Sequence, residues 1–325
     1  MKPNSSAIFN IKNDVEFNEL SLQTFRFQYQ NCLVYKQFVN LLKIKPLEIT
    51  NFKEIPFLPI VFFKNHIISS LALPPVYFFE SSGTMGSKSK HYYQSLDIYE
   101  ESFTRCFELF YGNPGAYTVL ALLPSYSSNP NSSLIYMVNS LIGKSQHKFN
   151  GFYNHNFSLL HDVLLKLKTT KTPTILIGVS FALLDFCSVH SFDFQELIVV
   201  ETGGMKGRRQ EMIREELHEV LCKGFNVNTI HSEYGMTELF SQAFSKGRGL
   251  FGCPPWMKVL ARDVYDPLSL SENDSGALNI IDLANINSCS FIATEDLGNV
   301  FPDGTFTVSG RFDSSQMRGC NLLIS

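Results

Sequence analysis

The hydrophobic residues of this chain gather in short runs that alternate with amphipathic segments. Runs of four to eight apolar residues predict strands buried on both faces. Such runs occupy residues 76–79, 117–123, 174–179 and 197–200. Apolar positions at helical spacing mark residues 15–42, 132–141, 181–187 and 212–221. This alternation predicts an α/β fold in which mixed, largely parallel sheets are flanked by helices.

The pattern changes near residue 255, where short strands and turns replace the longer helices. Strands are predicted at residues 258–261, 278–281, 291–293 and 306–308. Short strands without intervening helices favour antiparallel pairing. We therefore expect an α/β core over residues 1–254 and a β-rich subdomain with a short C-terminal arm over residues 255–325.

Composition narrows the class of protein. Of the 325 residues 44% are hydrophobic and 18% charged, so an intrinsically disordered chain is excluded. A net charge of −3 gives no reason to expect nucleic acid or an anionic membrane as the partner. The seven cysteines form no CxxC pair, and the sequence predicts neither a signal peptide nor a membrane-spanning segment. These features predict a cytoplasmic protein, and the 29 phenylalanines fit either a plain core or an acyl pocket.

The segment SSGTMGSKSKH directly follows the first predicted strand, and ligands of open parallel sheets bind where strands end. Ser81, Ser82 and Thr84 supply hydroxyl groups, and Gly83 allows the backbone to approach a ligand closely. Lys88 adds positive charge, so the segment can hold phosphate groups. The glycine and lysine spacing does not fit a Walker loop. The alternative is a flexible surface turn.

A second segment, YGMTE, combines groups that suit a nucleotide and its metal. Tyr234 offers a ring face to a planar base, and Gly235 permits close approach. Thr237 offers a hydroxyl to phosphate, and Glu238 offers an oxygen ligand for Mg²⁺. The alternative is a helix start, with Thr237 or Ser232 as its cap.

Two further segments, TEDLG and GRFD, suit ribose recognition. The carboxylate of Asp296 can accept hydrogen bonds from ribose hydroxyls, and Arg311 can hold ribose or phosphate oxygens. Each segment alone also fits an ordinary surface turn.

The four segments together, in this order, resemble the motifs of the adenylate-forming superfamily, which includes acyl-CoA synthetases, firefly luciferase and peptide-synthetase adenylation domains. Within it the chain is most similar to the bacterial acyl-protein synthetases of luminescence (LuxE type). This narrower resemblance covers nearly the whole chain and rests on FRFQYQNC from Phe25, IPFLP from Ile55, LIG from Leu176, TGGMK from Thr202, PPW from Pro254 and RGC from Arg318.

The resemblance implies ATP and Mg²⁺ as cofactors and assigns roles to residues. It assigns phosphate binding to Ser81, Ser82, Gly83, Thr84 and Lys88. It assigns adenine binding to Gly203, Gly204 and Tyr234, with Gly235 beside them. Glu238 would bind Mg²⁺, and Asp296 and Arg311 would bind ribose. The expected chemistry is attack of a carboxylate on the α-phosphorus of ATP, assisted by positioning and by neutralisation of charge.

The chain departs from the superfamily pattern after GRFD. Typical members continue for about a hundred residues, the size of a small domain, which carries a lysine that helps to form the adenylate. We expect that domain to be missing or truncated here, as it is in the luminescence-type synthetases. Lys206 and Lys88 are the candidates for a replacement cation.

The resemblance also implies an acyl-accepting cysteine. The luminescence-type synthetases acylate a cysteine near the C-terminus, and Arg318-Gly319-Cys320 matches that context. A thiolate is a good nucleophile, and the neighbouring Arg318 favours the thiolate form. The alternative is a buried structural cysteine. Cys253 is the lesser candidate, and Cys32 is expected to serve in packing.

The leading hypothesis is therefore a ligase that activates a carboxylic acid, expected to be fatty, and passes the acyl group through Cys320 to a partner protein. A second hypothesis keeps the adenylation but uses coenzyme A, a carrier-protein thiol or an amine as acceptor. A third is a catalytically inactive relative that acts as a binding or scaffold subunit. Apolar pattern alone does not identify the acid, because core and pocket residues look alike.

Overall fold

The computed structural model describes residues 2–72, 75–82, 88–124, 126–154, 156–190, 192–203 and 212–311. The chain forms two compact units. Unit 1 comprises residues 1–77, 89–94 and 255–325, and unit 2 comprises residues 78–88 and 95–254. Strands β2 (Tyr77–Glu80) and β3 (Lys90–Tyr93) lie where the chain passes from one unit to the other.

Unit 2 is built on a seven-stranded sheet in the order β10-β9-β8-β7-β6-β4-β5. Strands β4 to β8 pair in parallel, whereas β9 and β10 continue the sheet antiparallel. Their bounds are β4 Thr118–Leu122, β5 Gly151–Phe152, β6 Thr174–Val179, β7 Ile198–Thr202, β8 His231–Tyr234, β9 Ala243–Ser245 and β10 Phe251–Gly252. Every residue of β4 and β6 is buried, which explains their continuous apolar sequences.

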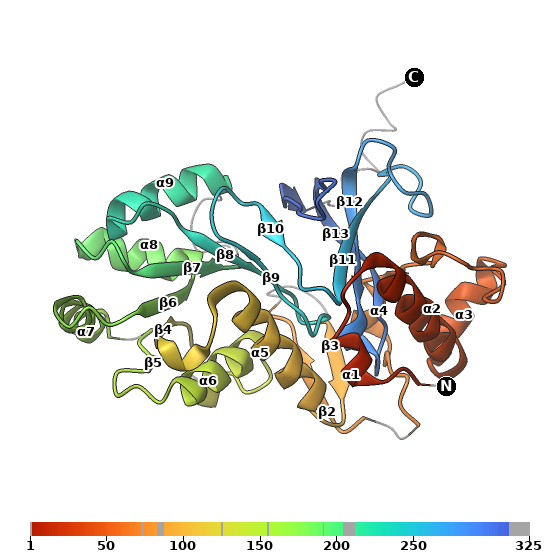
Figure 1. The fold of residues 1–325 in the computed structure, drawn as a ribbon, viewed down its shortest axis with the longest axis horizontal. Helices are drawn as coiled ribbons and strands as arrows, with labels where there is room; N and C mark the ends of the chain where they lie inside the picture. The colour runs from red at the N-terminus through yellow and green to blue at the C-terminus, as the bar shows by residue number, and fades with distance from the viewer. Residues whose placement is uncertain are drawn as a thin grey trace. The chain divides into compact units, whose positions relative to one another are not determined.

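Helices cover both faces of this sheet. Strand β5 pairs on one side of β4, and β6 pairs on the other side, so the order of the strands reverses direction after β5. Because parallel crossovers are right-handed, this reversal places α6 on one face of the sheet and the helices that follow on the other. Figure 1 shows α5 and α6 on one face and α8 and α9 on the other. The bounds are α5 Asp97–Tyr111, α6 Ser133–Ser145, α7 Phe157–Thr169, α8 Ser180–Val189 and α9 Arg214–Phe225, with short 3₁₀ turns at Pro114–Ala116 and Tyr126–Ser128.

Side-chain caps and apolar stripes explain where these helices begin and which face they bury. Ser132 caps α6 by accepting a hydrogen bond from the backbone N–H of Ile135, and Asn156 caps α7 in the same manner. Helix α9 buries Leu217, Leu221 and Phe225 and exposes its acidic residues.

Unit 1 is built on a five-stranded sheet in the order β1-β13-β12-β11, with β14 also paired to β13. Strands β11, β12 and β13 are antiparallel, β1 joins the first half of β13 in parallel, and β14 joins the second half antiparallel. The bounds are β1 Leu58–Pro59, β11 Met257–Arg262, β12 Ser275–Asp282, β13 Phe291–Asn299 and β14 Gly310–Arg311.

The helices of unit 1 supply aromatic side chains to its core. They are α1 Ser5–Ile8, α2 Asp14–Asn31, α3 Leu33–Leu41 and α4 Phe62–Asn65, with 3₁₀ turns at Phe52–Glu54 and Leu283–Asn285. Phe291 of β13 packs edge-on against Phe25 and stacks on Tyr35, with ring centroids 6.2 Å apart in each pair. All three rings are fully buried, so these contacts anchor α2 and α3 on the sheet.

The predicted fold class is confirmed, and two local predictions are wrong. The helix expected over residues 15–42 is two helices, because Cys32 adopts an extended conformation between them. The helix expected over residues 212–221 is confirmed as α9, which begins at Arg214 and ends at Phe225. The strand expected at 306–308 is a single bridge between Phe306 and Val300. Over the described ranges, no helix combines the length and apolar character that a membrane crossing requires.

Candidate active site

In unit 2 the carboxyl ends of β7 and β8 bring two predicted motifs together. Thr202, the last residue of β7, pairs in register with Glu233 of β8. Gly203 and Tyr234 follow these two residues and therefore lie beside each other at the sheet edge where parallel sheets bind ligands. Gly203 turns the chain with a φ of +61°, a left-handed conformation that glycine adopts without steric cost.

Tyr234 and Gly235 are held closely at the end of β8. Tyr234 is 8% exposed, and its ring centroid lies 5.8 Å from that of Phe251. A Cβ atom on Gly235 would lie 2.4 Å from a carboxylate oxygen of Glu233. Any larger residue at position 235 would therefore displace that carboxylate.

Thr237 and Glu238 lie in a turn after β8, and no helix begins there. The backbone N–H of Leu239 donates to the carbonyl of Met236 and closes the turn. The helix-start interpretation of this segment is therefore wrong, and Ser232 lies within β8 instead of capping a helix. The Glu238 residue is only 5% exposed, and a nearly buried carboxylate is suited to a cation or a hydrogen-bond donor.

Glu238 is compatible with Mg²⁺ only as part of a shared site. Over the described ranges no group of three or more His, Cys, Asp or Glu side chains is close enough to hold a metal ion. Magnesium in nucleotide sites is usually held by one or two carboxylates together with substrate phosphates. A single carboxylate at Glu238 fits that pattern, with the phosphates of ATP as the other ligands.

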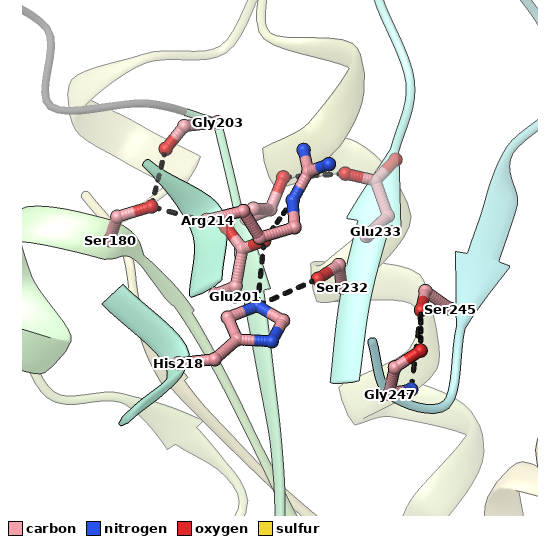
Figure 2. Close-up of polar contacts among 10 residues, drawn as sticks. Ser180, Glu201, Gly203, Arg214, His218, Ser232, Glu233, Ser245 and Gly247 are labelled. Atoms are coloured by element: carbon pink, nitrogen blue, oxygen red, sulfur yellow. Dashed lines mark hydrogen bonds and ion pairs between the residues drawn. The ribbon is translucent and has the colours of Figure 1, made fainter. Parts of the chain in front are cut away.

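Behind Gly203, a buried polar network runs from α8 to α9 (Figure 2). The Ser180 hydroxyl lies 3.1 Å from Oε2 of Glu201 and 3.0 Å from the carbonyl oxygen of Gly203. Oε1 of Glu201 lies 3.6 Å from Nε2 of His218 and 3.8 Å from Nε of Arg214. Burial by itself raises the pKa of Glu201, but contacts with His218, Ser232 and Arg214 outweigh burial and hold it below its ordinary value.

Two further groups adjoin this network. The Ser232 hydroxyl lies 3.2 Å from Nε2 of His218. Arg214 rests its guanidinium over the ring of Phe251, 5.0 Å from the centroid. Arg214 and His218 also line a cavity of about 290 Å³ beside α9, together with Thr229 and Arg248. The sequence does not predict this network. Its one signal is Glu201, a charged residue near the end of an otherwise apolar strand.

Glu233 is a second carboxyl group at the same sheet edge, and its environment raises its pKa, whereas the pKa of Glu201 is lowered. Burial and the negative charge of Glu201 raise the pKa of Glu233 to about 7, although Thr202 donates a short hydrogen bond to Oε2 and opposes the shift. Two carboxyl groups on neighbouring strands therefore differ in their tendency to ionise. Such differences concentrate at functional sites.

The structure describes three phosphate-binding candidates of the predicted phosphate loop, Ser81, Ser82 and Lys88. Ser81 is partly exposed, and Ser82 and Lys88 are exposed. Nζ of Lys88 lies 2.8 Å from Oε2 of Glu80, the residue before the loop. An exposed ion pair of this kind contributes little free energy.

In unit 1 the structure brings Asp296 and Arg311 together. They are register partners on β13 and β14, and Nε of Arg311 donates to Oδ1 of Asp296 across 3.1 Å. The turn interpretation of TEDLG is therefore wrong, because these residues lie within β13. The Asp296 residue is 5% exposed, whereas the Arg311 side chain is 73% exposed. The carboxylate is therefore held in the interior, whereas most of the arginine side chain lies at the surface.

Five of the predicted site residues lie outside the described ranges. They are Gly83, Thr84, Gly204, Lys206 and Cys320. Of the other cysteines discussed, Cys253 is partly exposed and Cys32 is buried. Burial raises the pKa of Cys32, which makes its thiol a poor nucleophile.

Comparison with known proteins identifies the fold. No protein-family model and no curated protein sequence matches the chain. Among solved structures, an open conformation of 2-hydroxyisobutyryl-CoA ligase in complex with 2-HIB-AMP and CoA is similar with a TM-score of 0.64 and 10% identity. That similarity covers 93% of this chain and 75% of the ligase. ATP-bound MatB from Rhodopseudomonas palustris is similar with a TM-score of 0.54 and 13% identity over 72% of this chain.

The fold is thus that of the adenylate-forming enzymes. This chain matches only 47% of the MatB chain, so it spans about half the length of that enzyme. At these identities the likeness establishes the fold, and the chemistry must be argued from the residues of this chain.

Proposed function

We propose that this protein activates a carboxylic acid with ATP and Mg²⁺ to form an acyl-adenylate. The observation that carries the proposal is the pairing of β7 with β8, which places Gly203 beside Tyr234 at the carboxyl edge of a sheet with an adenylate-forming fold. The nearby Glu238 supplies a nearly buried carboxylate for a cation. Asp296 and Arg311, joined in unit 1, are proposed to hold ribose.

In the proposed reaction a carboxylate oxygen of the acid attacks the α-phosphorus, and the bond to the bridging oxygen of pyrophosphate breaks. The residues of the chain act by position and charge. Ser81, Ser82, Thr84 and Lys88 bind the phosphates, and Thr237 donates a hydroxyl to phosphate. Lys206 supplies positive charge to the phosphates. The magnesium ion, when bound, neutralises phosphate charge.

We further propose that the acid is fatty and that Cys320 takes the acyl group. Its thiolate would attack the acyl carbonyl, forming a thioester and releasing AMP, before transfer to a partner protein. The match of Arg318-Gly319-Cys320 to the luminescence-type synthetases supports this step. One observation favours an external thiol instead: the similar 2-hydroxyisobutyryl-CoA ligase was captured with CoA.

The test is to incubate the protein with MgATP and a panel of fatty and aromatic acids, measuring pyrophosphate release and intact mass. A mass increase of one acyl group that is lost with hydroxylamine and absent in Cys320→Ser supports self-acylation. Pyrophosphate release without an adduct retains adenylation and points to an external acceptor, to be sought by adding coenzyme A. An absence of pyrophosphate with every acid would contradict the proposed activity.

A further inference from the structure

The strand that carries Asp296 is irregular where this residue lies. Strands β12 and β13 pair in register on either side of Leu278, but residues 294–296 of β13 lie opposite Leu278 alone. These residues therefore form a β-bulge, which bends a strand and re-aims its side chains. Bulges of this kind are frequent next to active sites. The direction of the Asp296 carboxylate thus depends on what holds the bulge.

Arg262 of β11 binds both strands of the bulge. Its Nη2 donates to the carbonyl of Thr294 across 2.6 Å, and its Nη1 donates to the carbonyl of Leu278 across 3.2 Å. Nη1 also donates to Oδ1 of Asn279 across 3.1 Å. Strand β12 lies between β11 and β13 (Figure 1), so the arginine reaches across one strand to bind the next. The planar, rigid guanidinium can hold these groups in one fixed arrangement.

The hydroxyl of Thr294 connects the bulge to Asp296. It donates to the carbonyl of Leu278 across 2.7 Å and accepts from the backbone N–H of Asp296 across 3.2 Å. The first bond uses the proton of the hydroxyl and the second uses a lone pair, so both bonds exist together. Arg262 binds the carbonyl of the same threonine, and its hold on the bulge therefore extends to the backbone of Asp296.

The charge of Arg262 carries a cost that its hydrogen bonds must offset. The residue is half-buried, and burial lowers the pKa of its guanidinium, whereas the charge of Glu295 opposes that shift. Arginine nevertheless stays charged in proteins, so removing it from water costs free energy. Apolar residues often replace buried charges without loss of stability, and a known use of such charges is to fix one geometry.

We propose that Arg262 is a positioning residue that holds the β13 bulge and thereby aims the Asp296 carboxylate at the ribose hydroxyls of the nucleotide. The inference rests on the proposed function, in which Asp296 binds ribose. Arg262 acts through the bulge and does not itself touch the nucleotide. Its loss weakens recognition of the ribose hydroxyls and leaves recognition of the base, the phosphates and the acid unchanged.

The test compares equilibrium binding of ATP with that of dideoxy-ATP, which lacks both ribose hydroxyls. The wild-type protein should prefer ATP by about 100-fold, because each hydrogen bond to a carboxylate contributes roughly a factor of 10. Arg262→Met removes the donors, keeps an unbranched side chain and should lower the preference to about 10-fold. A general loss of stability would instead weaken the binding of both nucleotides alike.

Arg26→Met is the matched control. Arg26 is also a half-buried arginine of unit 1 that donates to a backbone carbonyl, that of Ile49, but from α2. This variant should keep the preference of wild type. Arg262→Lys keeps the charge but not the planar fork, so it should lose part of the preference. It decides the matter if Arg262→Met does not fold, and an unchanged preference would overturn the inference.

Asp296→Asn separates this inference from the proposed function. If it keeps the preference of wild type, the ribose assignment of Asp296 fails and the inference fails with it. If it lowers the preference but Arg262→Met does not, the ribose site stands and the positioning role is overturned. If both lower it, the double variant decides: no further loss shows that Arg262 acts through Asp296, and an additive loss overturns the inference. Binding requires no turnover, so absence of pyrophosphate release would contradict adenylation alone.

Discussion

Arg311 donates a hydrogen bond from Nε to Oδ1 of Asp296 across 3.1 Å, which joins two segments that are 15 residues apart in the chain. The contact is possible because β14 pairs antiparallel with the second half of β13 and places the two residues in register. A second contact restrains the strand locally, since the backbone N–H of Asp296 donates to the hydroxyl of Thr294. The carboxylate is thus oriented before any ligand binds.

Replacing Asp296 by Asn should weaken ATP binding with little effect on folding. The amide keeps the size of the side chain but loses the charge that attracts Arg311 and strengthens hydrogen bonds from ribose hydroxyls. We expect the KM for ATP in pyrophosphate release to rise about 10- to 100-fold. Asp303→Asn is the control, because Asp303 is exposed and bonds only to Thr305 among the described residues. Equal KM values in the two variants would remove Asp296 from the ribose site.

Replacing Glu238 by Gln tests the metal proposal. Gln offers a neutral oxygen in place of a carboxylate, so the variant should bind Mg²⁺ poorly and should need more of it for the same rate. We expect a fall of at least about 100-fold in kcat/KM for ATP at low Mg²⁺, partly recovered as Mg²⁺ is raised. The measurement is a magnesium titration of pyrophosphate release, and an unchanged titration midpoint would argue against Glu238 as a ligand.

The periodicity of the sequence predicts the parallel core well because strands buried on both faces must be apolar throughout. Strands β4 and β6 were recognisable for this reason. Strand β8 was not, since its sequence, His-Ser-Glu-Tyr, looks like a polar loop. Its side chains are matched by partners from other elements, such as Tyr111 for His231 and His218 for Ser232. Such pairing is a tertiary property that no local pattern reveals.

In the candidate site, too, some features could be predicted from the sequence and others could not. Glycines, hydroxyls and charges in compact motifs indicate Tyr234 and Asp296 as candidates, because these signals are local in the sequence. The environment of Glu201 depends on residues from three other elements, and the contact of Asp296 with Arg311 depends on strand pairing. Likewise, nothing in the chain order indicates that residues 1–77 share a compact unit with residues 255–325.

Phe291 provides a test of the unit 1 core. Its ring is fully buried and contacts Phe25, Tyr35 and Phe57. Phe291→Ala should therefore lower the free energy of unfolding by about 3–5 kcal/mol through lost transfer free energy and the cavity that remains. Phe301→Ala, at a site that is 41% exposed, should cost well under half as much. Urea denaturation compares the two, and similar losses would show that the aromatic cluster is not central to stability.

The raised pKa of Glu233 makes the stability of the protein depend on pH. Its pKa is raised from 4.5 to about 7 on folding, so between these values the folded protein holds more protons than the unfolded chain. The free energy of unfolding should therefore fall as pH rises from about 4.5 to 7, by at most about 3 kcal/mol from this group. Glu233→Gln removes the titration, so its stability relative to wild type should increase from pH 5 to pH 8.

The difference between the two proteins is the quantity to measure, because other groups titrate in the same range. Burial lowers the pKa of His231 to about 4, so this residue makes stability rise with pH between about 4 and 6.5, opposite to Glu233. That contribution is common to both proteins and cancels when Glu233→Gln is compared with wild type by urea unfolding at each pH. Glu216→Gln, at an exposed position of α9, is the control substitution. A constant difference between Glu233→Gln and wild type would mean that Glu233 is already ionised at pH 5.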